Sequence, residues 1–171
     1  MEFKDVINNR YSCKNFDGRK VERAALQEIL EAARKAPTAK NLQEYHLYVI
    51  ESEEGLAKID RCTPCRYHAG TVTMVTYDST NVFVYPGDKR DSGIEDATIA
   101  ATHLMLAAAD QQVDSCWINY FDPQELAEVM ELPKQAEVLM PLDQGYHAQG
   151  KGPLPSPRER RSLRDMVHFL E

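Results

Sequence analysis

The sequence predicts a single domain in which helices and strands alternate, which is typical of the α/β or α+β class. Its 171 residues suit one domain, and a chain of this length buries enough surface to form a core. Apolar residues recur at helical spacing in 22–35, while 45–50 and 71–77 are rich in aromatic and β-branched residues, as strands are. These patterns indicate an ordinary globular protein.

The first half of the chain begins with a short helix, expected over residues 2–10. The helix at 22–35 ends before Pro37, because proline disfavours helical backbone in the residue that precedes it. Its apolar face is formed by Leu26, Ile29, Leu30 and Ala33. The elements expected after it are a strand at Tyr45–Ile50, a short helix at 53–61, an interior strand at 71–77 and a polar surface loop at 79–92.

The longest helix is expected from Glu95 to Gln111, and it is apolar on almost every side. A helix of this kind is normally buried all round. In so small a chain, we expect a core helix that also packs against a second subunit.

The second half continues with a strand at 115–118 and a helix at 124–131, which Asp122 caps and Pro123 opens. A strand at 137–142 follows. Residues 147–161 are rich in Gly, Pro and basic residues, and a last short helix is expected over 162–169. Since 147–171 has little to pack on within its own subunit, we expect it to reach over a partner.

The charge of the chain limits its partners. A net charge of −7 gives no general attraction to nucleic acid or to an anionic membrane. A bound phosphate would therefore need a local basic cluster. With no apolar run long enough for a bilayer and no visible signal peptide, we expect a cytoplasmic protein.

Several short motifs match other kinds of site only in part. Cys62 and Cys65 form a CxxC, but no second pair completes a zinc site; we favour a turn with two separate thiols over zinc or dithiol chemistry. Residues 145–151 (GYHAQGK) match a P-loop until Gly152 replaces the required Ser or Thr. The sequence holds no GxGxxG, GxSxG or HExxH, so we expect no metal, and His103 is interpreted as a core or interface residue.

Six segments carry a family resemblance. They are 9–16 (NRYSCKNF), 36–43 (APTAKNLQ), 93–109 (GIEDATIAATHLMLAAA) followed by 115–118 (SCWI), 121–123 (FDP) with Leu126, 145–146 (GY), and the basic stretch 158–164 (RERRSLR). In this order and spacing they resemble the nitroreductase family of FMN enzymes across nearly the whole chain.

The resemblance implies an α+β fold, a three-layer sandwich with a central, mostly antiparallel sheet flanked by helices. It implies one domain over residues 1–171, a homodimer built around the 95–111 helix, a C-terminal segment exchanged across the dimer, and FMN at each interface. The implied activity is a ping-pong transfer of two electrons from NADH or NADPH to a nitroaromatic, a quinone or a similar electrophilic acceptor. Because the cofactor supplies the chemistry, we nominate no catalytic acid or base.

The residues themselves fit FMN. Arginine binds phosphate through paired, charge-assisted hydrogen bonds, and Arg10 and Lys14 would share a helix face if the first helix continued. The resemblance implies that Arg158 and Arg160 meet the same phosphate, while Arg161 and Arg164 are interpreted as surface charges. It also implies that backbone N–H groups just past Trp117 approach the flavin N5 and O4 edge. The expected cofactor residues are Arg10, Tyr11, Ser12, Lys14, Pro37, Thr38, Asn41, Gln43, Asn119, Tyr120, Phe121, Arg158 and Arg160.

Three short stretches depart from the family pattern. Gln112-Val113-Asp114 stands where Gly-Leu-Gly is frequent, Gln43-Glu44-Tyr45 where Gln-Pro-Trp is, and Gly145-Tyr146-His147 where Gly-Tyr-Pro is. They leave two alternatives open: an FMN-storage or redox-sensing protein with little turnover, and a dimerisation module that has lost FMN.

Overall fold

The computed structural model describes residues 1–153 and 159–170. The helices in this part of the chain are α1 (Phe3–Asn9), α2 (Arg23–Arg34), α3 (Glu53–Cys62), α4 (Gly93–Asp110) and α5 (Pro123–Val129). The strands are β1 (Tyr45–Ile50), β2 (Thr71–Asp78), β3 (Asp114–Trp117) and β4 (Ala136–Gly145). Single 3-10 turns lie at Ala39–Asn41, Pro64–Arg66 and Leu163–Asp165.

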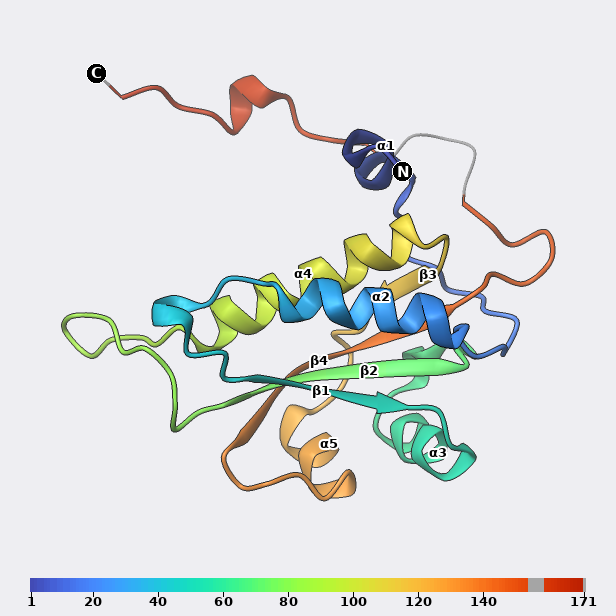
Figure 1. The fold of residues 1–171 in the computed structure, drawn as a ribbon, viewed down its shortest axis with the longest axis horizontal. Coiled ribbons are helices and arrows are strands. Elements are labelled where there is room, and N and C mark those ends of the chain that lie inside the picture. The colour runs from blue at the N-terminus through green and yellow to red at the C-terminus, as the bar shows by residue number, and fades with distance from the viewer. Residues whose placement is uncertain (154–158, 171) are drawn as a thin grey trace.

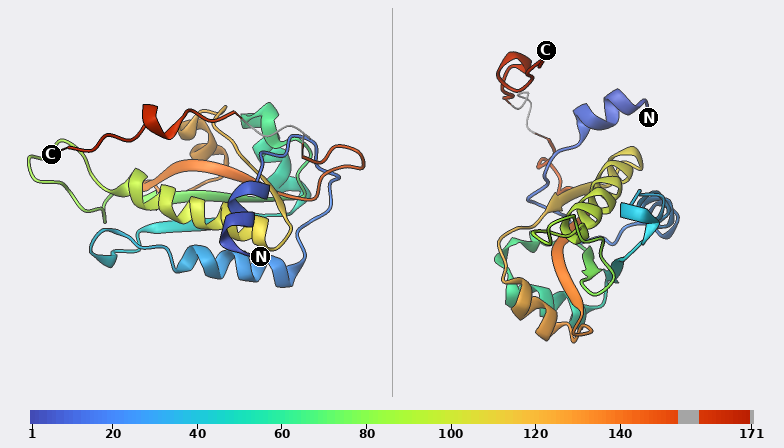
Figure 2. Two further views of the ribbon diagram at one scale, coloured as in Figure 1. Left: turned by 90° about the horizontal axis from the view of Figure 1, so that it is seen from above. Right: turned by 90° about the vertical axis from the view of Figure 1, so that its left-hand side faces the viewer.

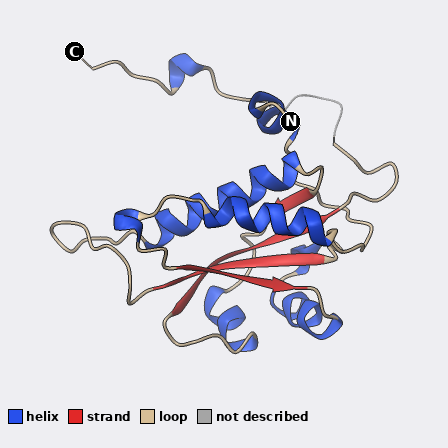
Figure 3. Ribbon diagram, in the orientation of Figure 1, coloured by secondary structure: helices blue, strands red, loops and turns tan. Residues whose placement is uncertain are grey.

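The four strands form one sheet in the order β1-β2-β4-β3, and every pairing is antiparallel. Helices α2 and α4 cover one face, and α3 and α5 cover the other (Figures 1 and 3). The expected α+β fold with helices on both faces of an antiparallel sheet is therefore confirmed.

Each face of the sheet has its own core. On one side, Leu26 and Ile29 of α2 and Leu104 of α4 pack on Val75 and Leu142 of the sheet. The opposite core joins α3 and α5 to the sheet through Ile59, Val72, Met74 and Leu126. A smaller third cluster contains Cys13, Phe16, Ala69, Cys116 and Ile118. It connects the 10–16 segment to the sheet.

Helix α4 begins two residues before the expected start at Glu95 and is the longest helix of the described chain. Its buried side is made by small residues and Leu104, which lie against the sheet and α2. The far side is only half-buried, and Ile94 is 61% exposed. The expectation that this helix is buried on every side is therefore not met within one chain.

The expectation of a C-terminal helix over 162–169 is wrong. Only the turn at Leu163–Asp165 forms, and the rest of the described segment is extended away from the body (Figure 2). Phe169 and Leu170 are 92% and 94% exposed. A short amphipathic helix is marginal without a surface to pack on, and this chain alone offers none. Among the described residues, no helix combines the length and apolar character needed to cross a membrane.

Candidate functional site

The 10–16 segment runs along the outer edge of β3. Helix α1 ends at Asn9, since Arg10 has extended backbone angles (φ −58°, ψ 129°). Ser12 pairs with Ser115 in a parallel bridge, and the Cys13 N–H donates to the Ser115 carbonyl at 2.9 Å. The helix therefore does not continue, and the expectation that Arg10 and Lys14 share a helical face is wrong.

A pocket of about 290 Å³ lies where α1, the C-terminal end of α4 and the start of β3 meet. Arg10 and Tyr11 line it, together with Asp114 and His147. Burial raises the pKa of Tyr11 well above its usual range, with Cys13 and Asp114 adding to the effect. The Tyr11 hydroxyl is buried and has no hydrogen-bond partner among the described residues. The lining thus combines a cation and a phenol, and both are donor types suited to an anionic ligand.

Two other expected residues of this segment, Ser12 and Lys14, do not line the pocket of Arg10. Ser12 is exposed, as expected of a hydroxyl available to a ligand. The Lys14 ammonium lies 5.9 Å from the centre of the Tyr67 ring, a cation–π distance. Lys14 is not among the residues that line the pocket of Arg10.

The loop at 37–43 follows the C-terminal end of α2. It contains Pro37, Thr38, Asn41 and Gln43. Asn41 and Gln43 have positive φ (56° and 54°), an uncommon conformation for residues with a side chain. The loop is held internally, because the Gln43 N–H donates to Thr38 Oγ1 at 3.0 Å and the Gln43 amide donates to the Asn41 carbonyl at 3.2 Å. It is also tied to α4, since the Ala39 N–H donates to Asp96 Oδ1 at 3.0 Å. The amide side chains are presented at the surface.

Within one chain, these two parts of the expected site lie far apart. The pocket of Arg10 is at the C-terminal end of α4, and the 37–43 loop is at its N-terminal end (Figure 1). The 18 residues of α4 span about 27 Å at the rise of an α-helix. The structure of one subunit therefore does not bring the two groups together.

The stretch past Trp117 leaves the sheet toward α5. Trp117 Nε1 donates to Asn119 Oδ1 at 2.7 Å, which fixes the turn. Tyr120 is 74% exposed, whereas Phe121 is half-buried and contacts all three apolar clusters. Of the expected C-terminal arginines, Arg158 lies outside the described residues. Arg160 is exposed, and its guanidinium donates to the neighbouring Glu159 carbonyl at 2.9 Å.

The CxxC does not form a dithiol site. Cys62 packs with the α3–α5 core, whereas Cys65 packs with the cluster around Cys13 and Cys116. All four cysteines are free thiols. No group of three or more potential ligands in the described part of the chain is placed to hold a metal ion.

Two buried carboxyl groups were missed by the sequence analysis. Asp143 in β4 is fully buried, and this burial raises its pKa to about 9, against the lowering effect of Arg66. Glu44 is 2% exposed, and its pKa is raised to about 7, first by burial and then by Asp96. For Glu44 a signal was present, because this acidic residue departs from the family pattern next to the expected cofactor loop.

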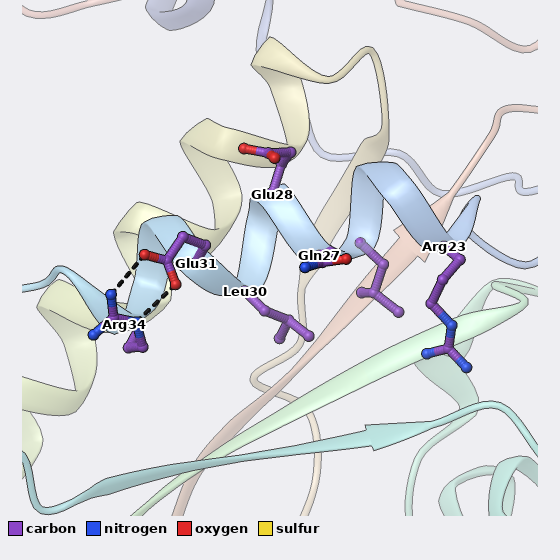
Figure 4. Close-up of a pocket in the computed structure, with 7 residues that line it drawn as sticks. Arg23, Gln27, Glu28, Leu30, Glu31 and Arg34 are labelled. Atoms are coloured by element: carbon purple, nitrogen blue, oxygen red, sulfur yellow. Dashed lines mark hydrogen bonds and ion pairs between the residues drawn. The ribbon is translucent and has the colours of Figure 1, made fainter.

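A second hollow, of about 460 Å³, lies along α2 (Figure 4). Arg23, Gln27, Leu30 and Arg34 line it, and the Arg34 guanidinium makes a two-pronged ion pair with Glu31 at 2.7 and 2.6 Å. It contains none of the expected cofactor residues. We therefore assign the candidate site to the pocket of Arg10 and the loop at 37–43.

Known structures share this arrangement of sheet and helices. A nitroreductase family protein from Clostridium difficile 630 is 31% identical, with a TM-score of 0.89 over 99% of this chain and 98% of that one. A structure from Exiguobacterium sibiricum in complex with FMN is 21% identical and has the same fold, with a TM-score of 0.85 over 99% and 98% of the two chains. The fold is thus that of nitroreductase-type proteins.

The chain belongs to the nitroreductase family, whose model matches residues 7–63 and 66–146. Among curated relatives, an Archaeoglobus fulgidus protein provisionally named NADH dehydrogenase/NAD(P)H nitroreductase is 24% identical over 151 residues, or 82% of this chain and 83% of that protein. The oxygen-insensitive NADPH nitroreductase of Helicobacter pylori is 24% identical over 165 residues, or 75% and 79% of the two chains.

Proposed function

We propose that this protein is an FMN-dependent oxidoreductase that takes two electrons from NADH or NADPH and passes them to a nitroaromatic, a quinone or a similar electrophilic acceptor. Family membership and the names of the relatives support an oxidoreductase that uses a nicotinamide. The single observation that carries the cofactor assignment is the pocket lined by Arg10 and by Tyr11, whose buried hydroxyl has no hydrogen-bond partner among the described residues.

The residues present fit FMN. The phosphate needs a local cation in this acidic chain, and Arg10 in the pocket supplies one. Tyr11 of the same lining and the exposed hydroxyl of Ser12 in the same segment would add O–H donors. The exposed amides of Asn41 and Gln43 offer donors and acceptors for the polar edge of the ring or the ribityl chain. FMN, when bound, supplies the two-electron chemistry.

We propose that the site is completed by a homodimer. A two-fold axis across the half-exposed face of α4 would place the C-terminal end of one α4 beside the N-terminal end of the other. Arg10 of one subunit would then lie near Asn41 and Gln43 of its partner. The extended segment 159–170, with its exposed Phe169 and Leu170, would pack on the partner, bringing Arg160 and Arg158 within reach of the phosphate.

Within this site, each group of residues has a distinct part. The basic residues anchor the phosphate, and the loop amides orient the ring. The backbone N–H groups of 119–121 stabilise negative charge at the edge of the ring. Tyr120, which is exposed in the single chain, would border the place that nicotinamide and acceptor occupy in turn. Alternate use of one place would give ping-pong kinetics.

An anaerobic absorbance spectrum of the purified protein tests the proposal. We expect flavin bands in the visible range that bleach on addition of NADH or NADPH and return on addition of a quinone. Bands that do not bleach would instead indicate FMN storage or redox sensing, and a colourless protein that takes up no added FMN contradicts the enzyme assignment.

A further inference from the structure

Two of the three departures from the family pattern contact each other. Asp114 is the first residue of β3, and His147 lies two residues beyond the end of β4. Asp114 Oδ2 accepts a hydrogen bond from the His147 backbone N–H at 2.8 Å and lies 2.6 Å from the imidazole Nδ1. The carboxylate is only 17% exposed and the imidazole 45%.

This pair fixes the chain where it leaves the sheet. His147 also forms an antiparallel bridge with Phe16, and the Ala148 N–H donates to the Asn15 carbonyl at 2.9 Å. A turn follows, in which the Lys151 N–H donates to the Ala148 carbonyl at 2.9 Å. Gly152 packs on the imidazole so closely that an added Cβ would lie 3.0 Å from Nε2. Residues 147–152 are therefore held against the 10–16 segment.

The contact lies in the pocket of Arg10. Asp114 and His147 both line that pocket, as does Pro153. The glycine that is frequent in the family at position 114 has no carboxylate, and proline at 147 has neither an N–H nor an imidazole. The contact in this chain therefore needs both of these departures, the carboxylate at 114 and the imidazole with its N–H at 147.

The electrostatic consequence concerns the phosphate. A carboxylate with little exposure in an anion pocket repels a dianion. The imidazole Nδ1 at 2.6 Å and the backbone N–H at 2.8 Å hold the carboxylate toward residue 147. Removal of the imidazole alone leaves the carboxylate in the pocket with the backbone N–H as its remaining contact at residue 147.

We propose that Asp114 and His147 are positioning residues for the FMN phosphate: their pair holds residues 147–153 beside Arg10 and turns the Asp114 carboxylate toward residue 147. This inference rests on the proposed function. It predicts that the two residues act as a unit, so that their substitutions are not additive.

A double-mutant cycle on FMN affinity tests this. His147→Ala should weaken FMN binding by about tenfold, because Asp114 remains charged. Adding Asp114→Asn to the His147→Ala variant should restore most of the lost FMN affinity, since the repulsive carboxylate charge is then gone. Loss of structure alone would not be repaired by a second substitution. The matched control is Asp110→Asn, which removes a carboxylate from the same end of α4, where it pairs with the Met1 amine at 2.7 Å, and should not restore affinity.

A second measurement does not depend on FMN. Trypsin cleavage after Lys151 in the protein without cofactor should be faster in Asp114→Ala than in the unsubstituted protein, because the turn has lost its anchor. Unchanged cleavage, or FMN affinity of His147→Ala equal to that of the unsubstituted protein, overturns this inference and leaves the proposed function intact. If the unsubstituted protein takes up no FMN, both are overturned.

Discussion

Glu44 and Asp96 place two carboxyl groups against each other in the interior, beside the 37–43 loop. Asp96 Oδ1 accepts the Ala39 N–H, but both oxygens of Glu44 and Oδ2 of Asp96 have no donor among the described residues. Two carboxyl groups can share a hydrogen bond only when one of them holds a proton. The pKa of Glu44 is raised to about 7. Protonation of Glu44 near neutral pH should therefore affect the expected cofactor loop, which Asp96 holds through the Ala39 N–H.

The first prediction concerns the stability of this pair. The folded pKa of Glu44, about 7, exceeds its unfolded value of about 4.3. The folded state thus binds more protons between these values, and stability falls as the pH rises through them. Glu44→Gln, whose amide donates permanently to Asp96, should stabilise the protein by about 1–3 kcal/mol at pH 8 and much less at pH 5. Thermal unfolding at the two pH values measures this, and an equal effect at both would contradict it.

The second prediction concerns Asp143, whose pKa of about 9 lies far above the unfolded value of about 3.9. The unsubstituted protein should lose stability as the pH rises from about 4 to 9, by up to roughly 1.4 kcal/mol per pH unit. Asp143→Asn should remove the contribution of Asp143, leaving the shallower fall that Glu44 causes below about pH 7, and should stabilise the protein most at high pH. Urea unfolding at pH 5, 7 and 9 measures the slope. Asp88→Asn, in the exposed 79–92 loop, serves as the control, and parallel slopes for all three proteins would refute the prediction.

The third prediction concerns the phosphate anchor. Arg10→Ala should weaken FMN binding by about tenfold or more, because a charge-assisted contact is worth roughly 1.5–3 kcal/mol. Fluorescence titration of released FMN gives the dissociation constant. Arg34→Ala, an exposed arginine paired with Glu31 on α2, should change it little. If the two variants retain FMN equally well, Arg10 is not the anchor.

The fourth prediction concerns the C-terminal segment. The exposed apolar side chains of Leu163, Phe169 and Leu170 would be covered by the partner in the proposed homodimer. Phe169→Ser combined with Leu170→Ser should weaken that proposed homodimer, without lowering the unfolding temperature of the monomer. Sedimentation velocity across a dilution series measures the shift. A protein that sediments identically with and without the substitutions would exclude this segment from the dimer.

Much of the fold could be predicted from local patterns. The helix expected at 22–35 is found at Arg23–Arg34, because an amphipathic repeat and Pro37 define it, and the strand at Tyr45–Ile50 was predicted at its full length. Strand β4 (Ala136–Gly145) is longer than the expected 137–142, since Asp143 and the Gly145 that follows it are residue types depleted in strands. Pro141 is tolerated because its pairing with β3 begins only at Leu142.

The site was harder to predict for a physical reason. Sequence order places Arg10 and Asn41 within one half of the chain, yet α2 and α4 separate them in space. The failed helix at 162–169 has the same origin, since its apolar residues find no surface on their own subunit. Buried polar groups such as Asp143 could not be predicted from the sequence pattern, because a single polar residue in a strand gives no indication that its side chain is buried.

The placement of Arg10 and the 37–43 loop at opposite ends of α4 has a genetic consequence. If each site takes its anchor from one chain and its loop from the other, a copy that lacks Arg10 and a copy with a damaged loop are both inactive alone. Expressed together, they form mixed pairs in which one site combines both defects and the other contains neither. Two inactive alleles would thus restore part of the activity, a form of complementation that is unavailable to an enzyme whose site lies within a single chain.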